Sequence, residues 1–353
     1  MDELRVGLIG FGYAGRWLHA PLIAATDGLR LAAVASSDPA KVHAALGPEV
    51  WVGDAAALIA RGDLDLIVIA TPNDLHHPQA LAALAAGRSV VVDKPFALNL
   101  KQAGELEAAV RKNGRLLSVF QNRRWDSDFL TVAQVLRERR LGRVVELVSH
   151  FDRFRPQVRD RWREGPGAAA GLWLDLGPHL VDQALRLFGL PTALSLDLAA
   201  VRDGARANDW FHAQLRWAQG EHAGLRVRLH ASALTAQPGA RFVVHGTLGS
   251  LTIEGLDGQE DALKSGADRR SIRSADWGRE RRSGRIALER GADVVEEPLP
   301  LLQGTYPAYY AAVRDALRGT GPNPVPPAEA VTVQQLLDLG LRGARERREV
   351  EVT

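Results

Sequence analysis

An apolar run at residues 4–10 ends in three closely spaced glycines, and few folds accommodate this arrangement. Gly10, Gly12 and Gly15 have the spacing G-x-G-x-x-G, and a helical pattern follows over about 14–25. A strand, a tight turn and a helix in this order begin a βαβ unit that binds a dinucleotide. Gly10 permits the turn, Gly12 leaves room for the pyrophosphate, and Gly15 lets the helix pack on the strand. Three structural glycines in a surface turn are the alternative interpretation.

Strand and helix patterns then alternate as far as residue 121. Short apolar runs typical of buried strands are separated by segments of helical period. Such alternation indicates βαβ units around a parallel sheet, so we predict a parallel α/β domain over residues 1–121. Its strands are expected at 4–10, 29–36, 51–52, 64–70, 89–93 and 115–120, and its helices at 14–25, 39–46, 55–60, 80–86 and 99–112.

Residues 122–353 follow a different pattern, which indicates an α+β domain. Between residues 193 and 256, strand-like runs joined by short turns predict an antiparallel or mixed sheet. Residues 257–292 are polar and rich in glycine and arginine, and we expect surface loops with one short helix there. Further elements are expected at 129–139, 178–188, 306–319 and 326–346 (helices) and at 143–151 (strand).

Composition excludes several classes of function. The chain has no cysteine, which excludes disulfides, zinc–thiolate sites and thiol catalysis. Its first residues show no separate apolar segment with a cleavage site, and no uncharged apolar run reaches about 18 residues. We therefore expect a cytoplasmic protein without a membrane span. The net charge is only +2 and the arginine clusters at 269–285 and 342–348 are interleaved with acids, so we expect no nucleic-acid partner. We expect no metal site, because no cluster has ligand spacing and the adjacent His76 and His77 would rarely face one ligand.

The end of the second predicted strand distinguishes NADP from NAD. In an NAD site, an acidic residue roughly 20 residues past the glycine turn bonds the ribose hydroxyls. Ser36 and Ser37 occupy that place here, and a serine can donate to a 2′-phosphate that a carboxylate would repel. Lys41 could reach the same phosphate. We predict NADP, with NAD as the alternative if Asp38 points inward instead of capping the next helix.

Lys94 stands where a buried strand ends, in a chain with five lysines against 39 arginines. Ligands of open α/β sheets bind beyond the carboxyl ends of the strands, where the turn at 71–76 should also lie. An ammonium at this edge can hold an alcohol oxygen and stabilise alkoxide-like charge as hydride leaves, and lysine can exchange a proton as arginine cannot. A surface turn residue followed by Pro95 is the alternative. The residues expected to contact the cofactor are Gly10, Phe11, Gly12, Tyr13, Ala14, Gly15, Ser36, Ser37, Thr71, Pro72, Asn73, His76 and Lys94.

A second candidate segment surrounds His179. Pro178 is a natural first helical residue, which would place His179 in the first turn of a helix. The positive end of the helix dipole would then keep the imidazole neutral, as a general base requires. Asp175 would lie just before the helix and orient the imidazole or bond a substrate hydroxyl, while Asp182 shares the face of His179. A capped helix with a buried, hydrogen-bonded histidine is the alternative.

Taken together, these segments resemble the Gfo/Idh/MocA oxidoreductase family over nearly the whole chain. They are GFGYAG at 10–15, TPNDLH at 71–76, DKP at 93–95 where the family usually has EKP, and DLGPH at 175–179. The segments 122–131, 153–164, 175–183 and 257–264 look like the branch of NADP-dependent scyllo-inositol dehydrogenases.

The resemblance implies a Rossmann domain, a doubly wound parallel sheet, followed by a C-terminal α+β domain with a large, mostly antiparallel open sheet. It implies a homodimer or homotetramer formed through that sheet. Carried over by motif, the catalytic group is Lys94, Asp175 and His179.

We therefore predict hydride transfer between NADP(H) and a hydroxyl or carbonyl of a cyclic polyol or sugar-like substrate. Arginine can bond sugar hydroxyls and tryptophan can stack on a sugar ring, although salt bridges and packing are nearly as good an explanation of these residues. The candidates for the substrate pocket lie in 122–125 and 153–163 and include Asn122, Arg123, Trp125, Arg161 and Trp162, beside Lys94, Asp175 and His179. An NAD-using glycosidase on the same fold, a non-catalytic NADP-sensing protein and a nucleic-acid binder are the rival interpretations.

Overall fold

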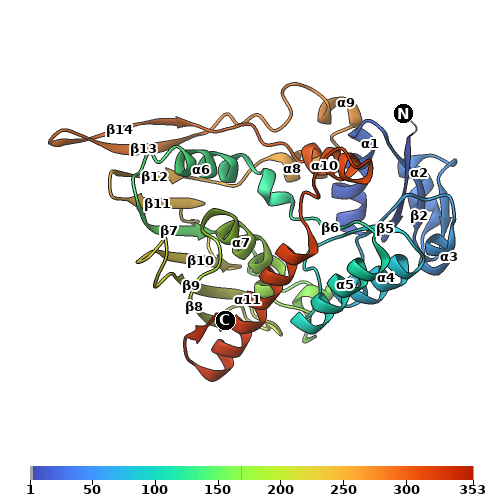
Figure 1. The fold of residues 1–353 in the computed structure, drawn as a ribbon, viewed down its shortest axis with the longest axis horizontal. Coiled ribbons are helices and arrows are strands. Elements are labelled where there is room, and N and C mark those ends of the chain that lie inside the picture. The colour runs from blue at the N-terminus through green and yellow to red at the C-terminus, as the bar shows by residue number, and fades with distance from the viewer. Residues whose placement is uncertain (1–2, 168, 353) are drawn as a thin grey trace. The chain divides into compact units, whose positions relative to one another are not determined.

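The computed structural model describes residues 3–167 and 169–352, which form two compact units (Figure 1). The first unit comprises Met1–Trp125, Gly258–Gly278 and Thr305–Gln334, and the second comprises Asp126–Asp257, Arg279–Gly304 and Gln335–Thr353. We had assigned everything after residue 121 to the second domain. Two later segments instead return to the first unit, where α8, α9 and α10 pack against the first helical segment of the chain.

The first unit is built on a six-stranded parallel sheet in the order β3-β2-β1-β4-β5-β6. Its strands are apolar and buried on both faces, as strands of a parallel sheet covered by helices must be. The chain runs outward from β1 in one direction and from β4 in the other, so the order reverses between these two strands. This confirms the predicted doubly wound sheet. The strands are β1 (Leu4–Ile9), β2 (Leu29–Ala35), β3 (Trp51–Gly53), β4 (Leu66–Ile69), β5 (Ser89–Val92) and β6 (Leu117–Val119).

Local capping explains where several helices of the first unit begin. The side chains of Asp38, Asp54 and Asn99 each accept a hydrogen bond from the backbone N–H three residues later. We had expected a helix at 80–86, but α4 begins at Asn73 and includes Pro78. The helices are η1 (Gly15–His19), α1 (Ala20–Ala25), α2 (Pro39–Leu46), α3 (Ala55–Ala60), α4 (Asn73–Ala85), α5 (Leu100–Asn113), η2 (Asn122–Trp125), α8 (Gln259–Lys264), α9 (Arg269–Ile272) and α10 (Pro307–Leu317).

The second unit is built on a nine-stranded sheet in the order β14-β13-β12-β11-β7-β10-β9-β8-β15. Only the β7–β10 pair is parallel, which confirms the predicted large, mostly antiparallel open sheet. In β9 and β10 every second side chain is buried, and α7 packs on these strands. The strands are β7 (Val144–His150), β8 (Ala193–Ala199), β9 (Trp210–Arg216), β10 (Arg226–Ser232), β11 (Phe242–Gly246), β12 (Gly249–Ile253), β13 (Ser283–Arg290), β14 (Asp293–Pro300) and β15 (Val350–Glu351). Its helices are α6 (Ser127–Arg137), η3 (Trp162–Glu164) and α7 (Leu172–Phe188), and α11 (Pro327–Glu346) runs from the first unit into the second.

The region 257–292 is more regular than we expected. It contains α8, α9 and β13, and β13 pairs with β14 in a long hairpin at the edge of the second sheet (Figure 1). Gly284, Ile286 and Leu288 are buried at alternate positions of β13, whereas β14 is exposed at almost every position. A strand exposed on both faces lacks the alternation that would reveal it. Among the described helices, none is long and apolar enough to cross a membrane.

Candidate functional site

The glycine turn after β1 is shaped by close backbone contacts. Gly10 has φ +96°, and a Cβ there would lie 2.7 Å from the carbonyl oxygen of Ala70. A Cβ at Gly15 would lie 1.9 Å from the carbonyl oxygen of Gly10, so that position also admits only glycine. At Gly12, by contrast, none of the described residues lies within 4 Å of where a Cβ would stand. The turn is therefore closely packed at Gly10 and Gly15 and open at Gly12. It stands at the start of a helical segment that begins at Tyr13.

An open groove lies in front of this turn, at the point where the strand order reverses. Its walls are the turn itself, the residues after β2, the start of α3 and the turn after β4. The lining residues are Ile9, Gly10, Phe11, Gly12, Ala35, Ser36, Ser37, Asp38, Lys41, Asp54, Ala55, Thr71 and Gln79. The open space at Gly12 and the helix N-terminus behind it fit the pyrophosphate of a dinucleotide. In open α/β sheets this reversal is where such ligands bind.

The predicted cofactor residues divide into two groups. Gly10, Phe11, Gly12, Ser36, Ser37 and Thr71 line the groove, whereas Tyr13, Ala14, Gly15, Pro72, Asn73, His76 and Lys94 do not. Tyr13 instead donates a hydrogen bond from its hydroxyl to Glu260 at 2.8 Å. The sequence did not point to Asp54, Ala55 or Gln79. A sequence signal existed for Asp54, because an acidic residue before a short helical pattern indicates an N-cap. Gln79 accepts a hydrogen bond from the Thr71 hydroxyl at 2.8 Å.

The segment after β2 presents hydroxyl groups and an ammonium to the groove. The Asp38 carboxylate accepts the backbone N–H of Lys41 at 2.9 Å and caps α2, which is the capping role we had considered for it. The Ser36 hydroxyl accepts the Asp38 backbone N–H at 3.2 Å. Ser37 and the Lys41 side chain are exposed at the same end of the groove.

Lys94 follows β5 and is held by the residue before it. Its backbone N–H donates to the Asp93 carboxylate at 2.7 Å, and the other carboxylate oxygen lies 3.7 Å from Nε2 of His19. His19 Nδ1 in turn lies 2.6 Å from the hydroxyl of Tyr310. Burial alone would raise the pKa of Asp93, but His19 and Lys94 outweigh it and hold that pKa below its usual value. An ionised, buried Asp93 therefore fixes the turn that carries Lys94.

His76 connects the turns that follow β4 and β5. The ring is buried, with Nδ1 at 2.8 Å from the carbonyl oxygen of Pro95 and Nε2 at 2.9 Å from that of Thr71. Burial lowers the pKa of His76 and outweighs the opposing charge of Asp93. The neighbouring His77 turns to Glu105, with 2.8 Å between Nε2 and the carboxylate. The two histidines thus face different partners.

The predicted substrate residues at 122–125 are packed inside the first unit. Asn122 and Arg123 are buried in η2, and the Arg123 guanidinium pairs with Glu260. The Trp125 ring meets Tyr309 edge to face, 5.4 Å between centroids. These contacts match the packing and salt-bridge interpretation that we had set beside the functional one.

Helix α7 begins earlier than we expected, at Leu172, so Pro178 and His179 lie in its middle. Asn208 explains the early start, because its side-chain oxygen accepts the Trp173 N–H at 2.9 Å and its carbonyl oxygen accepts the Leu172 N–H at 2.7 Å. The field of the helix N-terminus that we placed at His179 therefore acts on Asp175, which lies in the first turn. His179 is buried, one helical turn after Asp175.

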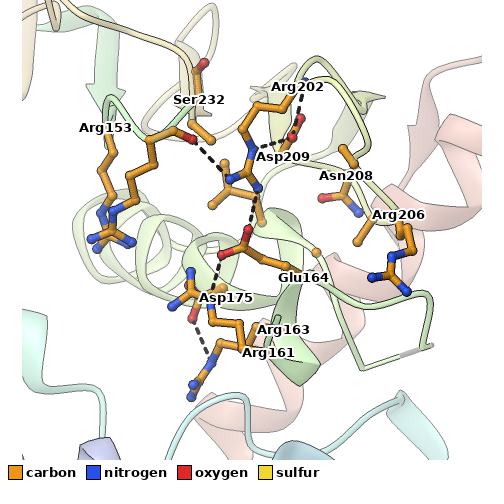
Figure 2. Close-up of a pocket in the computed structure, with 16 residues that line it drawn as sticks. Arg153, Arg161, Arg163, Glu164, Asp175, Arg202, Arg206, Asn208, Asp209 and Ser232 are labelled. Atoms are coloured by element: carbon orange, nitrogen blue, oxygen red, sulfur yellow. Dashed lines mark hydrogen bonds and ion pairs between the residues drawn. The ribbon is translucent and has the colours of Figure 1, made fainter. Parts of the chain in front are cut away.

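A pocket rich in arginine opens beside Asp175 in the second unit (Figure 2). We call it the arginine pocket. It is lined by Arg153, Arg155, Arg161, Arg163, Glu164, Gly171, Leu172, Asp175, Arg202, Ala205, Arg206, Ala207, Asn208, Asp209, Ser232 and Ala233. Of the predicted residues, Arg161 and Asp175 belong to it, while Trp162 and His179 are not among its lining residues. The Trp162 ring instead carries the Arg163 guanidinium, 4.4 Å from its centroid.

The loop 202–209 supplies pocket residues that we did not predict. Arg202, Arg206, Asn208 and Asp209 lie in the connection between β8 and β9, far in sequence from 153–163. A charged run between two strand patterns usually indicates a solvated turn, so the sequence held no signal for their role.

Lys94 lies in the first unit and Asp175 and His179 lie in the second. Their convergence on one substrate stays a prediction.

Comparison with known proteins agrees with this organisation. The model of the Gfo/Idh/MocA oxidoreductase family described as its NAD-binding Rossmann fold matches residues 4–121, and that of its C-terminal alpha/beta domain matches residues 133–352. The uncharacterized oxidoreductase YdgJ of Escherichia coli is 52% identical over 98% of each chain. The scyllo-inositol 2-dehydrogenase (NADP(+)) IolW of Bacillus subtilis is 31% identical over 99% of this chain and 96% of its own.

A solved structure gives the same result. YPO2259 from Yersinia pestis is 49% identical and superposes with a TM-score of 0.94, covering 100% of this chain and 98% of that one. Both family models, the relatives and the two described units thus agree on one assignment. The chain belongs to the Gfo/Idh/MocA family of NAD(P)-dependent oxidoreductases.

Proposed function

We propose that this oxidoreductase transfers a hydride between NADP(H) and a hydroxyl or carbonyl of a cyclic polyol or sugar-like substrate. One observation carries the proposal: the open glycine turn and Lys94 lie at the carboxyl edge of one parallel sheet, the turn after β1 and Lys94 after β5. The similarity to IolW, named as an NADP(+)-dependent scyllo-inositol 2-dehydrogenase, supports the choice of substrate class.

The groove residues would hold the cofactor, which accepts or supplies the hydride when it is bound. Gly12 and the helix N-terminus would receive the pyrophosphate. Ser36, Ser37 and Lys41 would receive a ribose 2′-phosphate, since hydroxyl and ammonium groups donate to phosphate oxygens. One carboxylate oxygen of Asp38 caps α2, so the carboxylate is less available to ribose hydroxyls. This supports NADP over NAD.

Lys94, Asp175 and His179 would share the work at the reacting carbon. His179 removes the hydroxyl proton during oxidation and returns it during reduction. The Lys94 ammonium holds the same oxygen and stabilises the negative charge that develops there. Asp175 accepts a hydrogen bond from a neighbouring hydroxyl and so orients the ring. No metal takes part in this scheme.

A substrate panel with a lysine variant tests the proposal. Inositols and aldoses are incubated with NADP or NAD, and absorbance at 340 nm follows the cofactor. We expect turnover with NADP to exceed turnover with NAD. Lys94→Ala should lower kcat/KM at least about a hundredfold while NADPH binding, followed by fluorescence, changes little. Lys101→Ala, on the exposed face of α5, is the matched control. Unchanged turnover in Lys94→Ala would refute the role assigned to Lys94.

A further inference from the structure

The charges that line the arginine pocket do not balance. Six arginines and three acidic residues line it (Figure 2). The cations are Arg153, Arg155, Arg161, Arg163, Arg202 and Arg206, and the anions are Glu164, Asp175 and Asp209. Such an excess of one charge in a concave site attracts ligands of the opposite charge.

The three carboxylates are already engaged by the chain's own arginines. Asp175 lies 3.5 Å from Nε of Arg163. Glu164 accepts from Arg161 at 2.6 Å and lies 2.9 Å from a guanidinium nitrogen of Arg202. Asp209 accepts from Arg202 at 2.7 Å, and it also accepts the Val201 backbone N–H. Figure 2 shows these pairs meeting at one side of the pocket.

Arg155 and Arg206 do not belong to these pairs. Within residues 3–167 and 169–352, the structure gives neither Arg155 nor Arg206 a side-chain hydrogen bond or an ion pair with a carboxylate. Arg206 is exposed, but Arg155 is half-buried. Burial lowers the pKa of the Arg155 guanidinium, and the charges of Arg153 and Arg159 lower it further. The charge of Asp175 opposes this shift, and arginine stays charged at neutral pH. A cation that no carboxylate holds by a hydrogen bond or a close ion pair thus stands where solvent reaches it only in part.

The wall that carries Arg155 is built rigidly. The buried Arg202 guanidinium donates to the backbone carbonyl oxygens of Arg155 at 3.1 Å and Gln157 at 3.2 Å, while it also bonds Asp209 and Glu164. A buried side chain that makes four such contacts has little freedom to move. The backbone that carries Arg155 is therefore held in place before any ligand arrives, which lowers the entropy that binding would lose.

The N-terminus of α7 adds a favourable field, although its first N–H groups are already bonded. Gly171 and Leu172 line the pocket, so the positive end of a 17-residue helix opens on it. Asn208 occupies the N–H groups of Leu172 and Trp173. Recognition of an anion would therefore fall to guanidinium forks, whose geometry matches planar carboxylates and phosphates.

We propose that the arginine pocket binds an anionic oxygen group of the substrate, a carboxylate or a phosphate, through Arg155 and Arg206. The substrate class is then an acidic or phosphorylated sugar or polyol rather than a neutral one. Asp175 belongs to the same pocket, so an anion held there would keep the hydroxyls of that molecule beside Asp175. This inference rests on the proposed function for the identity of the ligand as a substrate, although the pocket itself can be tested without turnover.

Steady-state kinetics test the substrate class. Glucose and myo-inositol are compared with D-glucuronate, glucose 6-phosphate and myo-inositol 1-phosphate, each with NADP or NADPH. At least one anionic compound should have a kcat/KM at least tenfold above its neutral counterpart. Arg155→Gln and Arg206→Gln should each remove at least tenfold of that advantage through KM. Arg290→Gln, on the exposed end of β13, is the control for the loss of one charge. Equal kcat/KM for neutral and anionic compounds would overturn the proposal.

Calorimetry separates this inference from the proposed function. The protein is saturated with NADPH, so that the phosphate-binding turn of the first unit is filled, and is titrated with inorganic phosphate and with D-gluconate. We expect binding of at least one anion, with a Kd at least tenfold higher in Arg155→Gln and Arg206→Gln at unchanged melting temperature. Anion binding in this titration, together with no turnover of any compound in the kinetic panel, would refute the proposed reaction while supporting the pocket. No difference between the wild type and the two variants would refute the pocket.

Discussion

The buried His76 ring lies between two backbone carbonyl oxygens, and a neutral imidazole can donate a hydrogen bond to only one of them. The two ring nitrogens lie 2.8 Å and 2.9 Å from these oxygens. Protonation would satisfy both acceptors, yet burial disfavours the cation and lowers the pKa of His76. The histidine therefore joins the turns after β4 and β5 at neutral pH and becomes costly to keep buried in acid.

This residue predicts how stability changes with pH. A folded-state pKa below the unfolded value of about 6.5 means that the unfolded chain binds more protons, so stability falls as pH falls from about 7 to about 5. The limiting slope is about 1.4 kcal/mol per pH unit for one proton. His150 and His212, whose pKa values burial also lowers, act in the same direction.

Urea unfolding at pH 7.5 and 5.5 measures the effect. His76→Gln keeps an N–H donor but cannot titrate, so it should reduce the fall in stability between pH 7.5 and pH 5.5. The same slope in His76→Gln as in the wild type would rule out His76 as its source.

At the scale of elements, the helix that carries Asp175 shows what local sequence does and does not reveal. Buried parallel strands appear as short apolar runs, which is why the sheet of the first unit could be predicted. The start of α7 could not, because its cap is Asn208, 35 residues beyond the Trp173 N–H that it binds. Pro178 lies inside α7 and not at its start, so the predicted helix start was wrong. His179 consequently lies outside the first turn, where the helix dipole acts.

Removing the cap should destabilise α7. Asn208→Ala deletes the acceptor for Trp173 N–H, and loss of such a cap costs about 0.5–2 kcal/mol. Asn208→Asp retains a side-chain oxygen and places negative charge at the helix N-terminus, so it should recover most of the loss. The midpoint of urea unfolding for the two variants and the wild type provides the measurement. Equal midpoints for Asn208→Ala and the wild type would show that the carbonyl of residue 208 caps the helix alone.

At the scale of the whole molecule, the order of the chain hides part of the organisation. The change of pattern near residue 121 could be read locally, and it lies close to Trp125, where the first segment of the first unit ends. The return of Gly258–Gly278 and Thr305–Gln334 could not, since it depends on contacts such as the Val119 N–H with the carbonyl of Val325. The arginine pocket was hidden in the same way, because it joins three segments far apart in sequence. The sequence motifs indicated the type of reaction, but segments far apart in sequence are brought together only in the folded chain.

The second sheet also bears on assembly, and a homodimer or homotetramer through it stays a prediction. On β9 and β10 the side chains opposite α7 include Trp210 and His230, 5.4 Å between ring centroids, and Arg228 paired with Glu146. Tryptophan and arginine are both enriched at protein–protein interfaces. Trp210→Glu should then raise the dissociation constant at least about thirtyfold, the equivalent of about 2 kcal/mol, because it places an unpaired carboxylate against the partner. Light scattering after size exclusion measures this as a shift from a multiple of 38.3 kDa to the monomer mass. Val294→Glu, on the exposed β14, is the control, and a wild type that already elutes as a monomer would refute the predicted assembly.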